Sequence, residues 1–177
     1  MSDDTPKTYD SIASETIAAY LQASPDLSSY MVAQSGKWFG FDEDDGKFPI
    51  KPSRGEIPFI IFGPAVVKER WVKNCLKEEE HDWTIQIGVD LRFQRNIKTL
   101  AALISAAVAR GDKEDRFGLA SRFDEIGLYK VDCVTDRPQK AYEQGENRLT
   151  PLYWTADIHV IGYFERRPEV SPIITGG

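Results

Sequence analysis

The amino-acid sequence predicts an α+β fold of two layers, in which helices flank a mostly antiparallel sheet in the order α-β-β-β-α-β-β. Three observations lead to this prediction. Residues 83–93 alternate between apolar and polar side chains, which is typical of a half-buried strand. A helical pattern precedes that strand at 11–23, and a second one follows it at 97–110. Helices that lie before and between groups of antiparallel strands give a two-layer α+β domain.

The first helix is expected over 11–23. Asp10 or Ser11 can cap it by accepting a hydrogen bond from an early backbone N–H. Apolar residues then recur at helical spacing, and Pro25 ends the run. Residues 30–41 mix β-forming residues with two glycines, which predicts a short strand that leads into a loop.

A surface loop and a buried strand come next. Residues 42–55 hold a run of acidic side chains and two prolines, a composition that favours an excursion over the surface. The apolar run IPFIIF at 57–62 is followed by a Gly-Pro pair, and it predicts a buried strand that begins at its proline. Residues 66–80 are rich in charge.

The strand at 83–93 carries the clearest pattern. Its predicted apolar face consists of Trp83, Ile85, Ile87, Val89, Leu91 and Phe93. Such clean alternation favours antiparallel neighbours, because parallel strands are covered on both faces and lose it. Asn96 offers an N-cap for the helix at 97–110, and Gly111 fits its C′ position. This helix is apolar nearly all round, and its alanines allow close approach to a sheet or to another subunit.

Two further strands are expected near the end of the chain. Residues 129–133 and 154–164 both alternate between apolar and polar side chains. The polar stretch between them, 140–150, predicts a long hairpin loop. One short helical turn is expected around 117–123.

The length of 177 residues suits a single domain. We expect this domain to span residues 10–166, with a flexible leader at 1–9 and a C-terminal arm or disordered tail at 167–177. The net charge of −6 and the pI near 5.0 disfavour binding to phosphate backbones. No apolar run approaches the roughly 20 residues of a membrane span. No export signal is evident, so we expect synthesis in the cytoplasm and reduced cysteines.

The soft metal ligands of the chain are Cys75, His81, Cys133 and His159. No two of them have the short C-x-x-C or H-x-x-x-H spacing with which one turn presents two ligands to zinc. The alternation places Cys133 toward the core and His159 toward the outside. We therefore expect no metal site and no cofactor, and ordinary packing or surface roles for these side chains.

The surface loop contains four consecutive carboxylates, Asp42, Glu43, Asp44 and Asp45. The loop begins like an EF-hand, but Gly46 stands at its third ligand position and Ser53 replaces the bidentate Glu. The helices that should flank an EF-hand loop are missing from the pattern. A solvated acidic loop is the favoured interpretation, and a loosely bound divalent cation is the alternative.

No catalytic motif accompanies these residues. Nucleophilic catalysis needs a base within reach of the nucleophile, and the chain has two histidines in all. The sequence contains no G-x-S-x-G elbow and no phosphate-binding glycine motif. We therefore expect a protein that is not an enzyme. Trp38 and Trp71 are expected in the core or, as the alternative, at an interface, where Trp is enriched.

Several longer segments share the order and patterning of one protein family. They are IAAYLQASPDL, IPFIIFG, HDWTIQIGVDLRF, NIKTLAALISAAVARG, LYKVDCV and LYWTADIHVIGYFER. Over residues 10–166, the chain resembles the phage tail-terminator (tail-completion) proteins of long-tailed phages in the order, length and pattern of its elements.

The resemblance implies a non-enzymatic structural subunit of a virion, located in the tail or neck and assembled in the host cytoplasm. Such subunits form a homo-hexameric ring that ends the tail tube, and they contact the tail-tube protein and the head–tail connector protein. DNA would pass through the ring without sequence-specific binding. An acidic lining would repel its phosphates, which offers a role to Asp42, Glu43, Asp44 and Asp45.

Three alternatives stay open. The chain could be another neck or head-closure component of the same particle. It could also be a small metal-dependent hydrolase that uses carboxylates from the regions of Asp42 and Glu78. A monomeric protein-binding adaptor is the third alternative.

Overall fold

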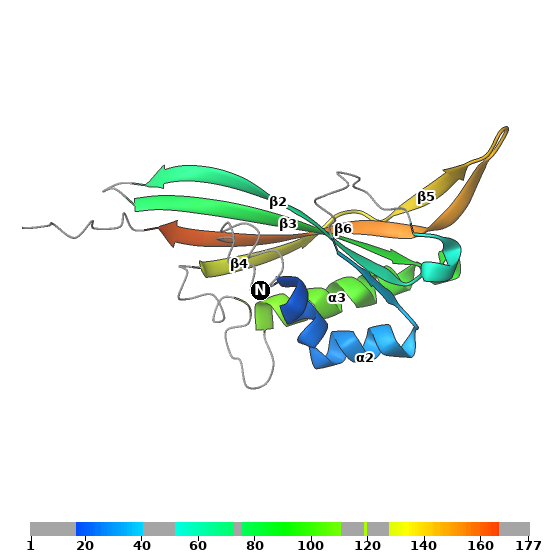
Figure 1. Ribbon diagram of the computed structural model, residues 1–177, viewed down its shortest axis with the longest axis horizontal. Coiled ribbons are helices and arrows are strands. Elements are labelled where there is room, and N and C mark those ends of the chain that lie inside the picture. Colours follow the sequence, from blue (N-terminus) through cyan, green and yellow to red (C-terminus); the bar gives the residue numbers. More distant parts are fainter. Residues whose placement is uncertain (1–16, 41–51, 73–75, 111–118, 120–127, 167–177) are drawn as a thin grey trace, which may run out of the picture.

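The computed structural model describes residues 17–40, 52–72, 76–110, 119 and 128–166 (Figure 1). After a helical segment at 17–23, the elements are α2 (Pro25–Ala33), β1 (Lys37–Phe39), η1 (Arg54–Glu56), β2 (Phe59–Val72), β3 (Leu76–Val89), η2 (Leu91–Phe93), α3 (Arg95–Arg110), β4 (Leu128–Thr135), β5 (Gln139–Gln144) and β6 (Leu149–Arg166). None of the helices in these ranges is long and apolar enough to cross a membrane.

The described strands form one six-stranded sheet in the order β1-β2-β3-β6-β4. β4 and β5 both pair with β6, β4 with its second half and β5 with its first half. Every pairing is antiparallel except that of β1 with β2. The predicted α+β class and the mostly antiparallel sheet are therefore confirmed.

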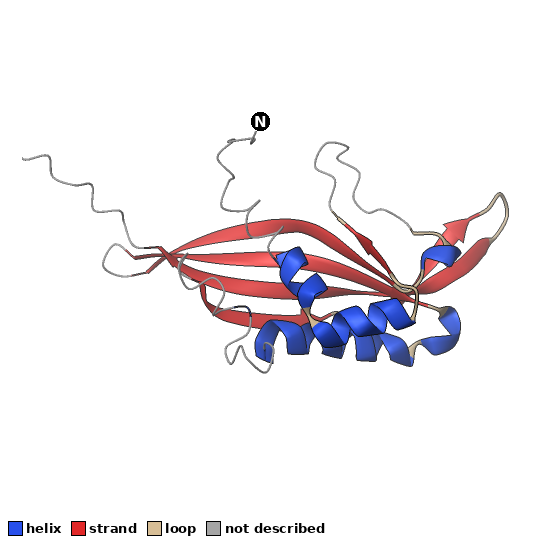
Figure 2. Cartoon of the chain, turned by 60° about the horizontal axis from the view of Figure 1, so that its bottom comes forward, coloured by secondary structure: helices blue, strands red, loops and turns tan. Residues whose placement is uncertain are grey.

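Helices α2 and α3 lie on one face of the sheet, which gives the molecule two layers (Figure 2). The main core fills the space between the layers. The helices contribute Ile17, Leu21, Leu27, Met31, Ile97, Leu100, Ile104 and Val108, and the sheet contributes Ile60, Trp83, Ile85, Ile87, Ile158, Val160 and Phe164. Burial of this apolar surface is the main source of stability. Neither α2 nor α3 lies on the opposite face of the sheet, which we call the outer face.

The hairpin of β5 and β6 projects beyond the helices as an arm (Figure 1). A second, smaller cluster of buried residues holds its base on the outer face: Phe59, Ile61 and Tyr153. The rings of Phe59 and Tyr153 meet edge to face, with their centroids 5.0 Å apart. The Arg54 guanidinium also donates to the carbonyl of Pro151 at 2.8 Å. Since a lone hairpin is marginally stable, these contacts are what fix the arm on the body.

Two predictions for the first half of the chain need new boundaries, namely the strand at 30–41 and the C-terminal end of the strand at 57–62. Pro25 ends the first helical segment, but it also begins α2, because proline fits the first turn of a helix. The strand expected at 30–41 is consequently reduced to the three residues of β1. The buried strand expected at 57–62 is found, but β2 continues through the charged residues to Val72.

The later boundaries differ in three places. β3 ends at Val89, because the Asp90 side chain caps the 3-10 turn η2 by accepting from the backbone N–H of Arg92 at 2.9 Å. Leu91 and Phe93 therefore lie outside the strand. Helix α3 begins at Arg95, so Asn96 lies inside the helix and is not its N-cap. The helix is not buried all round, because Lys98, Thr99 and Ala102 are exposed. The loop expected at 140–150 is mostly the hairpin itself.

Some predictions fall outside the described residues. They concern the leader 1–9, the first turn of the 11–23 helix, most of the 42–55 loop, Cys75, the Gly111 cap, the turn at 117–123 apart from Leu119, and the tail 167–177. The strands expected at 129–133 and 154–164 are confirmed as β4 and the second half of β6.

Candidate assembly surfaces

The outer face is a polar ladder that runs across four strands. The strand register aligns its members in rows, because directly paired residues point to the same side of a sheet. They are Val66 and Lys68 from β2, Glu80, Asp82, Thr84 and Gln86 from β3, Asp157, His159, Ile161 and Tyr163 from β6, and Lys130, Asp132 and Val134 from β4.

His159 lies at the centre of this ladder between two carboxylates. Its Nδ1 is 3.0 Å and 3.1 Å from the two carboxylate oxygens of Asp82, and its Nε2 is 3.4 Å from Asp136. Asp136 follows β4 and is fixed by its own backbone N–H, which donates to the Asp157 carbonyl at 2.8 Å. The cluster therefore ties β3, β6 and the end of β4 together.

The pKa of His159 is raised by this arrangement. Burial on its own lowers the pKa, since it disfavours the charged ring. The hydrogen bond and charge of Asp82, followed by those of Asp136, outweigh that effect. The imidazolium therefore persists to a higher pH than it does in an ordinary histidine.

Other charges on the outer face are paired within the ladder. Lys68 lies 3.6 Å from Glu80, and Lys130 lies 2.7 Å from Asp132. The Lys130 ammonium also stands 4.8 Å from the centre of the Tyr163 ring. These pairs are exposed, so each contributes little to stability. These pairs do determine the positions of positive and negative charge along the two edges of the sheet.

The two long edges of the sheet are open among the described residues. β1 pairs only with Phe59–Ile61 of β2, and β4 has a described partner on one side only. An apolar side chain is exposed at each of these edges: Val66 is 54% exposed and Val134 is 51% exposed. Open edges with apolar side chains are sites where another strand can add.

The remaining titratable side chains of chemical interest are buried on the core side. The Nε2 of His81 lies 3.1 Å from the Glu79 carboxylate, and the His81 ring packs against Phe164 with centroids 4.6 Å apart. Because His81 is fully buried, no substrate could reach it in this conformation. Cys133 faces the core as predicted, and burial raises the pKa of its thiol although Ser105 acts in the opposite direction. A protonated thiol is a poor nucleophile.

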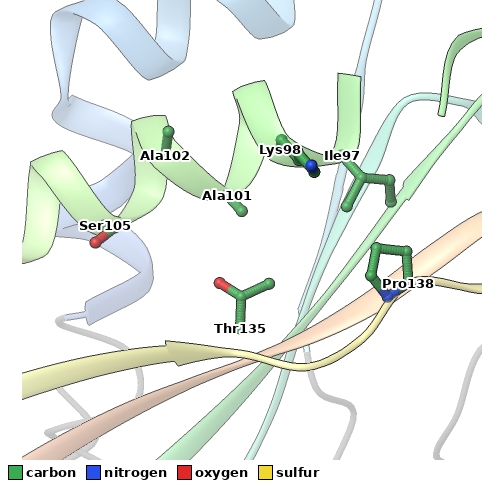
Figure 3. A pocket seen from close by; sticks show the side chains of 7 residues that line it. All are labelled: Ile97, Lys98, Ala101, Ala102, Ser105, Thr135 and Pro138. Atoms are coloured by element: carbon green, nitrogen blue, oxygen red, sulfur yellow. The ribbon is translucent and has the colours of Figure 1, made fainter. Parts of the chain in front are cut away.

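Two of the surface hollows are lined by described residues and gather no catalytic set. A groove of about 390 Å³ runs beside α3 and is lined by Ile97, Lys98, Ala101, Ala102, Ser105, Thr135 and Pro138 (Figure 3). A second hollow, of about 490 Å³, separates η1 from the arm and is lined in part by Arg54, Glu143 and Gln144. Within the described ranges, no group of three or more His, Cys, Asp or Glu is arranged to hold a metal ion.

The structure describes only some of the residues that the sequence predicted as site residues. Trp38 packs on the main core, and its ring stacks on Phe62 with centroids 6.0 Å apart and planes 7° apart. The backbone of Trp71 pairs with that of Lys77 near the far end of β2. The acidic residues Asp42, Glu43, Asp44 and Asp45 lie outside the described residues. The predicted interface and channel roles of all six therefore stay predictions.

Sequence reasoning missed the cluster around His159. The alternation of β6 placed His159 outside the core, and that orientation is what the structure has. Nothing in the linear pattern pointed to Asp82 or Asp136, which are 77 and 23 residues away. The outward alternation of Asp82 in β3 was the one available signal.

Comparison with solved structures bears on the fold of the chain. A chain of the virion of a native gene transfer agent (GTA) particle has a similar fold, with a TM-score of 0.52 and 16% sequence identity. The match covers 90% of this chain and 100% of that chain. No protein-family model and no curated protein matches the sequence. At this identity, the likeness establishes the fold of the chain.

Proposed function

We propose that this protein is a structural subunit of a phage or phage-like particle, and specifically the ring-forming subunit that terminates the tail tube and joins it to the head–tail connector. The observation that carries the proposal is the fold shared with a chain of a gene transfer agent virion, along 90% of this chain and all of that one. The resemblance of the sequence to tail-terminator proteins supports the finer role.

The surface of the subunit supports the same proposal. A closed ring needs two different complementary patches on each copy. The sheet offers two open edges of different composition, β2 and β4, and the arm adds a third projecting element. His81 is fully buried, and burial raises the pKa of the Cys133 thiol, so neither of these two side chains offers an accessible catalytic group.

The proposal is tested by the mass of the protein in solution over a concentration series, followed by negative-stain imaging and by binding to purified tail tubes. We expect a ring of hexamer size, formed in solution or on tube ends. Rings that bind isolated connectors but not tubes would assign the protein to the neck or head closure instead. A strict monomer that binds neither tubes nor connectors would refute the proposal.

The acidic loop is proposed to line the channel of that ring. DNA carries dense negative charge, so carboxylates at 42–45 would let it slide without adhering. Reversing these charges to lysine should slow DNA ejection while the ring stays intact. Normal ejection from particles that carry the reversed loop would rule out this role.

A further inference from the structure

We propose that neighbouring copies of this chain join edge to edge, with β4 of one copy pairing antiparallel to the open part of β2 of the next, so that Val134 stands across from Val66 and Asp132 across from Lys68. This inference rests on the proposed ring and identifies the surface that closes it.

Strand direction makes this junction antiparallel. β2, β3, β6 and β4 alternate in direction across the sheet, because each of the three pairings is antiparallel. The two edge strands, β2 and β4, consequently run in opposite directions. When copies are related by rotation about an axis along the strands, β4 therefore meets a β2 that runs the opposite way. The ladder then continues with the antiparallel pattern it has inside each subunit.

The side chains at the two edges fit one register. Val66, Lys68, Asp132 and Val134 all belong to the outer face. Placing Val134 across from Val66 covers one exposed apolar side chain at each edge. The same register brings Asp132 across from Lys68, which adds an attractive charge pair. The same register places Arg70 across from Lys130, a pair of like charge, with Glu78 beside Arg70 as its partner in β3.

This register also supplies the stagger that a closed sheet requires. Inside one subunit, the row that begins at Val66 passes through Asp82 and Ile161 and ends at Asp132. Pairing Val66 with Val134 of the neighbour instead moves the ladder by two residues at every junction. A sheet can close into a barrel only when its strands are staggered in this way.

A β4–β2 contact between neighbouring copies suits these edges better than a two-fold β4–β4 contact between two copies. A two-fold β4–β4 contact would leave both β2 edges open, and assembly would stop at two chains. A contact between β4 and β2 uses both long edges in every copy, so assembly continues from copy to copy until the ring closes.

Cysteine cross-linking tests the register directly. Two chains are prepared in a Cys75→Ser, Cys133→Ser background, one with Val66→Cys and a size tag, the other with Val134→Cys. Directly opposite residues have their Cβ atoms within about 5.5 Å, so mild oxidation or a short bifunctional maleimide should join them. When the two chains are mixed at concentrations that give rings, or on tail tubes, the mixed dimer should be the main covalent product.

The matched control replaces Val66→Cys by Val32→Cys. Val32 is 77% exposed but lies on α2, away from both edges, so its cysteine should give only background cross-linking to Cys at 134. A charge exchange adds a second readout. Lys68→Asp or Asp132→Lys alone should weaken assembly on the order of tenfold or more, since like charges then face each other. The double exchange should restore it.

The outcomes separate this inference from the proposed function. Rings whose Val66→Cys and Val134→Cys chains cross-link no better than the Val32→Cys control would overturn the edge pairing and leave the ring intact as a proposal. Chains that stay monomeric at every concentration and on tail tubes would overturn both. Cross-linking above control, together with rescue by the charge exchange, establishes the register.

Discussion

Replacing His159 by glutamine should remove a pH-dependent part of the stability of this protein. Glutamine keeps a hydrogen-bonding amide in the cluster but cannot become charged. In the folded protein the pKa of His159 is raised above its ordinary value of 6.5. Its charged form therefore stabilises the fold fully below about pH 6.5, and that contribution is lost as the pH rises through the folded pKa.

The size of the effect follows from the two contacts. His159 and Asp82 are 28% and 22% exposed, and the ring nitrogen is within 3.1 Å of both carboxylate oxygens. A charge-assisted hydrogen bond in such a half-screened place contributes about 1 kcal/mol. Asp136 is 58% exposed and lies 3.4 Å away, so it adds only about 0.3 kcal/mol.

Urea unfolding of the wild type and of His159→Gln measures this at about pH 5.5 and about pH 8.5, a range in which the carboxylates stay ionised. The stability advantage of the wild type should be larger at the lower pH by about 1 kcal/mol. Asp82→Asn should abolish most of the pH dependence, and Asp136→Asn should leave most of it. An advantage that is equal at the two pH values, or that grows with pH, would show that the folded protein does not favour the imidazolium.

Two further predictions concern packing on the outer face. Gly88→Ala should destabilise the protein by about 1–3 kcal/mol, because the added Cβ would stand 2.2 Å from the ring of Phe59. Gly40→Ala is the matched control, because no atom lies within 4 Å of its added Cβ. Urea unfolding compares the stabilities of the two variants. Tyr153→Ala should destabilise the protein by about 3 kcal/mol, because it opens the cluster at the base of the arm. Leu149→Ala at the exposed tip should change stability by less than about 0.5 kcal/mol. Equal effects of the two substitutions would contradict the anchoring of the arm by this cluster.

Strands with one buried face could be predicted from the sequence because their side chains alternate in a way that burial demands. Trp83, Ile85 and Ile87 are buried on the core side, and their polar neighbours point outward as predicted. The alternation continues in the sequence beyond Val89, but the chain does not follow it. A local interaction, the cap formed by Asp90, fixes the next residues in a turn before a strand can extend.

Elements that bury little were missed for a physical reason. The second part of β2 mixes apolar and charged residues without a regular period, and β5 has mostly polar, exposed side chains, so neither leaves a hydrophobic period to detect. Their backbones pair because β3 and β6 present long ladders beside them. Such strands depend on tertiary partners, and a single sequence does not name those partners. The same limit hid Asp82 and Asp136 as partners of His159.

The two-layer arrangement also bears on which surface would face the interior of a ring. Helices α2 and α3 add bulk to one side of the sheet (Figure 2). Subunits that join through their sheet edges have most room for this bulk outside the ring, which would turn the outer face of the sheet toward the axis. That face carries more carboxylates than lysines, namely Glu80, Asp82, Asp132 and Asp157 against Lys68 and Lys130. Under the proposed edge pairing, an acidic lining would therefore come from the sheet itself, and the charge on His159 would set how negative its centre is.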